Sequence, residues 1–84
     1  MHELSLMAGL LEKVGQLAAE NGATRVMTVD ITIGALAGIS EDHLKEHWRA
    51  ASIGTIAEGA ELRTTVSEDP LSTGLVLQSL ELET

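Results

Sequence analysis

The spacing of the apolar residues switches between a helical and a strand period along this chain, and this switching constrains the fold more than any other feature. The first segment has apolar residues three or four positions apart, which predicts one face of a helix: Leu4, Met7, Leu11, Val14 and Ala18. Asn21-Gly22 predicts a left-handed end for that helix. From Val26 to Gly34 apolar and polar residues alternate, as in a half-buried strand, with Met27 among the inward side chains.

The second half of the chain predicts one more helix and two more strands. Ser40 is a suitable N-cap for a helix beginning at Glu41, and Trp48 is expected to anchor that helix on the sheet. Alternation resumes in residues 60–66 and 76–82, on either side of a turn at 67–74. Gln78 interrupts the alternation of the last strand, which leaves the face of this residue open.

This order predicts a protein of the α/β (α+β) class. We expect a small α-β-α-β-β domain, in which two helices cover one face of a three-stranded mixed sheet. The strand–helix–strand unit should cross over right-handed to give a parallel pair. The last two strands should form an antiparallel hairpin. Residues 1–84 are expected to be a single domain, and such a small domain is marginal alone, so a homodimer or a constant partner is a reasonable expectation.

Charge and composition exclude several classes of function. The formal net charge is −8 and only five residues are Lys or Arg, which argues against nucleic acid and against anionic membranes as partners. The chain has no cysteine, so it has no disulfide, thiolate nucleophile or Cys-based zinc site. It shows neither a membrane-spanning apolar run nor a signal-peptide pattern, which predicts a cytoplasmic protein. No catalytic triad order or phosphate-binding glycine loop is present, so we expect no enzyme.

The first three residues, Met1-His2-Glu3, carry the main candidate metal site. A free α-amine, the next backbone nitrogen and the imidazole of His2 can close fused chelate rings around one ion. Glu3 can fill the fourth position through its amide or its carboxylate. Nitrogen-rich, square-planar sites suit Ni(II) or Cu(II) better than zinc. An ordinary frayed terminus is the alternative.

His43 and His47 form a second candidate, because residues four apart on a helix can share one metal ion. No further ligand accompanies them in the sequence. A surface pair without a metal is therefore the favoured interpretation, and a helix-borne metal site is the alternative.

Four segments of the chain resemble the HypA/HybF family, which delivers nickel during assembly of [NiFe]-hydrogenases. They are Met1-His2-Glu3-Leu4-Ser5-Leu6, the Ile-Gly-Ala-Leu-Ala-Gly-Ile stretch at 33–39, the Gly-Thr and Ala-Glu-Gly-Ala-Glu-Leu residues at 54–62, and the closing Leu-Glu-Leu-Glu at 80–83. These segments occur in the family's order and extend from one end of the chain to the other.

The resemblance implies Ni(II) binding at Met1, His2 and Glu3, and a hydrogenase large subunit or a nickel-handling GTPase as the partner. It also shows two departures. The family's zinc domain, with two Cys-x-x-Cys pairs, has no counterpart, and a turn near 67–74 stands in its place, so no zinc is expected. Ala35 stands where the family often has Glu. A nickel-binding accessory protein is thus the leading hypothesis, and an adaptor that keeps the fold without handling metal is the alternative.

Overall fold

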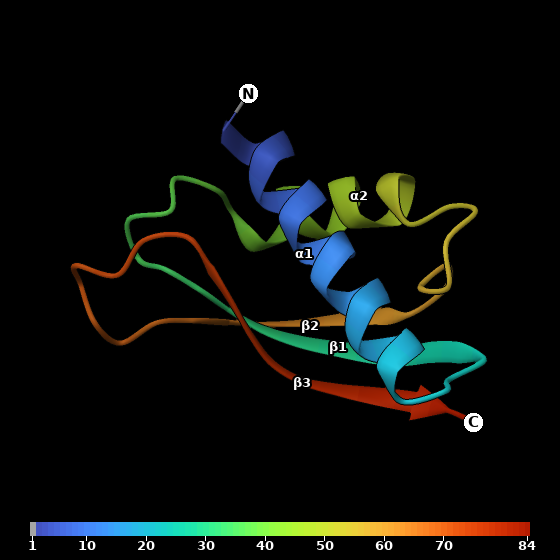
Figure 1. Cartoon of the computed structure of the whole chain (residues 1–84). Helices are drawn as coiled ribbons and strands as arrows, with labels where there is room; N and C mark the ends of the chain where they lie inside the picture. Colours follow the sequence, from blue (N-terminus) through green and yellow to red (C-terminus); the bar gives the residue numbers. More distant parts are fainter. Residues whose placement is uncertain (1) are drawn as a thin grey trace.

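The five expected elements are all present in the computed structural model, which describes residues 2–84 and the side chains of residues 5–84. Along the chain they are α1 (His2–Glu20), β1 (Arg25–Ile33), α2 (Glu41–Ala51), β2 (Glu61–Val66) and β3 (Leu75–Glu83). Figure 1 shows both helices on one side of the sheet, with α1 running across it. The predicted α-β-α-β-β class, with a three-stranded mixed sheet, is confirmed.

The order of the strands in the sheet is β2-β1-β3, with β1 parallel to β2 and antiparallel to β3. The expected hairpin between the last two strands is therefore wrong. The residues between β2 and β3 pass the end of β1, and β3 pairs with the free edge of β1 instead. This arrangement gives β1, the most buried strand, a hydrogen-bonded neighbour on both sides. It also places β3 under α1, where its leucines pack against the core.

Two register shifts in the β1–β3 ladder explain where the alternation of the sequence fails. Val26 pairs with Leu82 and Thr28 with Glu81, so Met27 is an extra residue in β1. As a result Val26 is fully buried and Met27 is 38% exposed, and the prediction of an inward Met27 is wrong. Bulges of this kind shift the alternation by one residue.

The second shift occurs at Gln78, the residue whose face the sequence left open. Asp30 pairs with Ser79 and Ile31 with Leu77, so Gln78 is an extra residue in β3 and is exposed. Leu77 and Leu80, three positions apart, therefore both pack against the core.

The core is aliphatic apart from one tryptophan. Helix α1 contributes Met7, Leu10, Val14 and Ala18, as its spacing predicted for Met7, Val14 and Ala18. Helix α2 contributes Leu44 and Trp48, which are 0% and 3% exposed. The anchoring role predicted for Trp48 is confirmed. Ser40 also caps α2 as predicted, because its side chain accepts a hydrogen bond from the backbone N–H of His43 at 3.2 Å.

The segment between β2 and β3 is bonded to the end of β1 by three backbone hydrogen bonds. The N–H of Gly34 donates to the carbonyl of Gly74 at 2.8 Å, and the N–H of Leu36 donates to that of Ser72 at 2.8 Å. The N–H of Ser67 donates to the carbonyl of Ile33, also at 2.8 Å. Gly34 is buried, and a Cβ at this position would lie 2.7 Å from the Ser72 carbonyl oxygen. The turn thus closes this end of the sheet by direct backbone contact.

Candidate metal centre

The first candidate site lies at the start of α1. Met1 is outside the described residues, and the structure describes the backbone of His2 and Glu3 but not their side chains. Their backbone forms the beginning of α1. The first four N–H groups of a helix have no carbonyl partner within the helix, so the amides of His2 and Glu3 are not engaged in α1's own ladder. This position leaves the backbone nitrogens of the proposed chelate outside the helical hydrogen bonds.

The second candidate site lies on α2. The imidazole rings of His43 and His47 are stacked, with their centroids 5.0 Å apart and their planes inclined by 29°. His43 is exposed and His47 is half-buried. Among the residues whose side chains are described, no third His, Asp or Glu joins them in a cluster able to hold a metal. The two side chains are therefore neighbours, as predicted, and together they offer two ligands to a metal ion.

The segment that carries the two histidines also matches a metal-binding motif that their spacing alone does not reveal. Residues 43–47 read His-Leu-Lys-Glu-His, which is the His-x-x-Glu-His order of inverted zinc-protease motifs. In such motifs the two histidines bind the metal, a further ligand comes from another element, and the glutamate acts on water. Because α2 has only the two histidines within the described side chains, the motif supplies metal-ligand spacing without the rest of a protease site.

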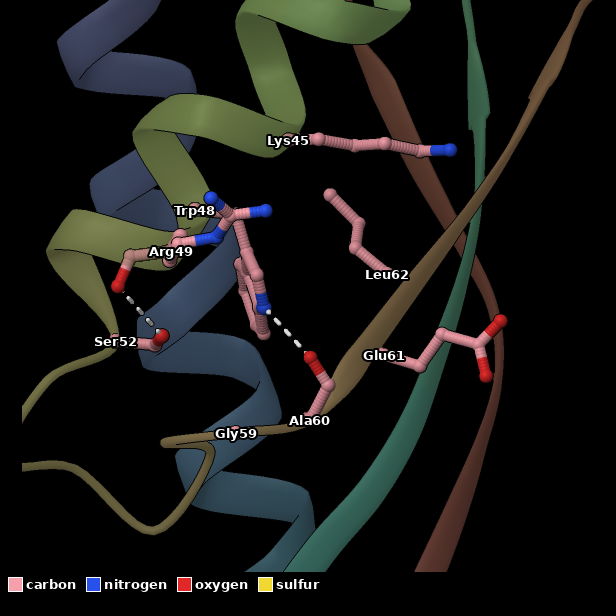
Figure 2. A pocket seen from close by; sticks show the side chains of 8 residues that line it. All are labelled: Lys45, Trp48, Arg49, Ser52, Gly59, Ala60, Glu61 and Leu62. Carbon is pink, nitrogen blue, oxygen red and sulfur yellow. Dashed lines mark hydrogen bonds between the residues drawn. The ribbon is translucent and has the colours of Figure 1, made fainter.

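A groove of about 330 Å³ separates α2 from the start of β2 (Figure 2). Trp48 forms its wall, and the indole Nε1–H donates to the carbonyl of Ala60 at 3.4 Å. Lys45 and Arg49 extend from α2 on the same side. Two cationic side chains repel a metal cation, so this groove is unsuited to nickel although it lies on the same helix as the histidines.

The uncovered face of the sheet carries a small charged network. Arg63 donates to the Glu61 carboxylate at 3.3 Å and lies 4.0 Å from that of Glu81. The hydrogen bond from Arg63 to Glu61, together with the charge of Glu61, raises the pKa of Arg63. Asp30 accepts a hydrogen bond from the Ser79 hydroxyl at 2.9 Å. Since Glu61 and Asp30 already have partners, this face offers no open carboxylate cluster to a metal.

Ala35 lies exposed in the connection after β1. The methyl group there has no metal-binding capacity, so this loop supplies no carboxylate where the family resemblance places one.

No helix within the described part of the chain is long and apolar enough to cross a membrane.

These features define a two-layer α/β domain with a candidate nitrogen-donor metal site at the start of its first helix. A family model described as "Hydrogenase/urease nickel incorporation, metallochaperone, hypA" matches residues 1–72. The chain belongs to this HypA family. It is 40% identical over 74 residues to the hydrogenase maturation factor HypA of Chlorobaculum tepidum, and 44% identical over 62 residues to that of Chlorobium limicola. These matches cover 88% and 74% of this chain.

The chain spans 63% and 53% of the length of these two relatives. Its fold is similar to the solution structure of the Ni metallochaperone HypA from Helicobacter pylori, with a TM-score of 0.81 and 16% identity over 99% of this chain and 98% of that one. At this identity the likeness concerns the fold alone. With no cysteine in the sequence, this chain cannot form a Cys-based zinc site.

Proposed function

We propose that the chain is a nickel-binding accessory protein for the maturation of [NiFe]-hydrogenase. The observation that carries this proposal is the family match over residues 1–72, which includes the Met1-His2-Glu3 terminus. Met1 supplies its α-amine, His2 its imidazole and the backbone nitrogen, and Glu3 the fourth ligand. The start of α1 at His2 supports this geometry, because the amides of the first turn have no helical acceptor.

The bound ion is Ni(II), held in a square-planar set of mainly nitrogen ligands. The protein passes this ion to a hydrogenase large subunit or to a nickel-handling GTPase in the cytoplasm. Handing over a metal requires no catalysed reaction, in agreement with a family description that names metal incorporation by a metallochaperone. We also infer that the turn at 67–74 stands where relatives carry a zinc module, so transfer proceeds here without zinc.

Nickel titration of the protein with a free amino terminus tests the proposal, with any tag removed from the C-terminus. We expect one equivalent of Ni(II) to give the visible absorption of a square-planar complex, and His2→Ala to abolish it, because the imidazole closes the second chelate ring. Acetylating or extending the terminus should have the same effect by removing the amine. If these three proteins produced the same spectrum as the wild type, the terminus would be excluded and the adaptor hypothesis would take its place.

Nickel binding at the terminus should weaken as the pH falls. The α-amine has an ordinary pKa of about 7.7–8.0, and it must lose its proton to bind metal. Below this pKa, competition from the amine proton alone is expected to lower the apparent affinity for Ni(II) about tenfold for each unit by which the pH falls. Calorimetric titrations at pH 6, 7 and 8 measure this slope. An affinity independent of pH across the range would contradict coordination by the amine.

A further inference from the structure

We propose that His43 and His47 form a second Ni(II) site, on the flank of α2 that faces α1. The two imidazoles supply two ligands, and water completes the coordination. This site is distinct from the terminal one in its residues and in its geometry, since it contains no amine and no backbone nitrogen. The inference does not rest on the terminal chelate, and each site can be lost without the other.

The separation of the two rings fits a shared metal ion. With metal–nitrogen distances of about 2.0–2.1 Å, two imidazoles on one ion have ring centroids roughly 4.5–5.2 Å apart for angles between square and tetrahedral. The observed separation is 5.0 Å. The rings therefore already have the spacing of a chelating pair, and binding requires rotation of side chains without movement of the helix.

The turn of helix α2 that carries His43 and His47 is held in place at both ends. The N–H of His43 is held by the Ser40 side chain at the helix cap. Leu44 and Trp48, each next to a histidine in the sequence, are buried in the core. A metal site placed on a rigid element loses little entropy on binding.

The periodicity of α2 places the pair on the side toward α1. At about 100° per residue, Lys45 and Arg49 lie on one side of the buried Leu44, and His43 lies on the other. Figure 2 shows Lys45 and Arg49 beside the groove that borders β2. The histidine flank consequently points away from β2 and toward α1, which contacts α2. The half-buried state of His47 agrees with this position between the helices.

The charges near the pair favour a cation. Glu46 is adjacent to His47 in the sequence and lies on the same side of α2 as His43, and the whole chain has a net charge of −8. The two cationic side chains of the helix project from the opposite flank. Imidazole is a suitable ligand for nickel, copper and zinc, so the donor set selects borderline divalent ions over Mg²⁺ or Ca²⁺. Having only two protein ligands, the site should bind Ni(II) more weakly than the terminus and exchange it readily.

Calorimetric nickel titration of the whole chain, with visible spectra recorded in parallel, tests this inference in four proteins: the wild type, His2→Ala, His43→Ala and the double variant. We expect the wild type to bind two equivalents, and His2→Ala to keep only the weaker one, without the square-planar spectrum. We expect His43→Ala to lose the weaker equivalent and keep the spectrum, and the double variant to bind none. His43 is exposed, so its replacement should leave the fold intact, as far-UV circular dichroism can verify.

Lys45→Ala is the matched control, since it removes an exposed side chain of the same helix from the opposite flank. This variant should retain both equivalents. The inference is overturned if His2→Ala binds no nickel, or if the weaker equivalent survives in His43→Ala. Failure of the terminal site has a different signature, namely absence of the square-planar spectrum in the wild type with the weaker equivalent still present.

Discussion

Replacing Trp48 by Ala is expected to lower the free energy of unfolding by about 3–5 kcal/mol, the usual cost of removing a buried aromatic side chain. The indole is 3% exposed, and it joins α2 to the start of β2 through its hydrogen bond to the Ala60 carbonyl. No Phe or Tyr is present in the sequence to fill the space left behind. Since domains of this size are only marginally stable, most of the total stability should be lost.

Urea denaturation followed by far-UV circular dichroism measures this effect, because removal of the only tryptophan also removes the fluorescence signal. Trp48→Phe is the matched control: it keeps most of the apolar volume and loses the hydrogen bond, so its cost should be clearly smaller. An Ala variant within about 1 kcal/mol of the wild type would contradict the anchoring role, because truncation of an aromatic residue that is truly buried costs several times more.

All five helices and strands could be predicted because their signals are local in the sequence. Neighbouring residues alone determine the helix and strand periods, the cap at Ser40 and the helix end at Gly22. These signals do not depend on the rest of the fold. Gly22 has a φ of 65°, the left-handed conformation that the Asn-Gly pair indicated.

The pairing of the last strand depends on residues far apart in the chain, and here the sequence pattern misled. A tight hairpin needs a connection of two to five residues, and the connection after β2 is longer, running from Ser67 to Gly74. Such a length can cross the end of β1 and reach its other edge. The bulge at Met27 is equally non-local, because an extra residue is defined only against the partner strand β3.

The candidate metal residues show the same contrast between features set by neighbouring residues and features set by residues far apart in the chain. Helical spacing alone predicted that His43 and His47 would be neighbours, and their rings are 5.0 Å apart. Helical periodicity also places them on the opposite side of Leu44 from Lys45 and Arg49. Which element faces that side of α2 depends on how the helix packs in the fold, and no local pattern contains this information. The terminal ligands Met1, His2 and Glu3 remain a prediction, because their chemistry comes from the amine and side chains rather than from the packing of the domain.

Introducing a side chain at Gly34 is the second change with a large expected effect. A Cβ at this buried position would lie 2.7 Å from both the Ser72 carbonyl oxygen and the Thr73 carbonyl carbon. These contacts are to backbone, which cannot move aside as a flexible side chain does. Gly34→Val must therefore push the connection at 67–74 away from the end of β1. This displacement breaks the backbone hydrogen bonds that Gly34 and Leu36 donate to Gly74 and Ser72.

Overpacking typically costs about 1–3 kcal/mol. Each of the two hydrogen bonds adds about 1 kcal/mol. We therefore expect Gly34→Val to lower the free energy of unfolding by about 3–5 kcal/mol. Chemical denaturation monitored by Trp48 fluorescence measures the loss, since the tryptophan remains in this variant.

Gly9→Ala is the matched control, because a Cβ added there in the middle of α1 has no described atom within 4 Å apart from its chain neighbours and the nearby backbone of its own helix. Its expected effect has the opposite sign, a gain of roughly 0.8–1.0 kcal/mol from helix propensity. The contrast separates contact at Gly34 from a general preference for glycine. If Gly34→Val were as stable as the wild type, the connection at 67–74 would not be packed on the end of β1. A large loss would show that the connection at 67–74 packs on the end of β1 and helps to hold β2 and β3 on opposite sides of it.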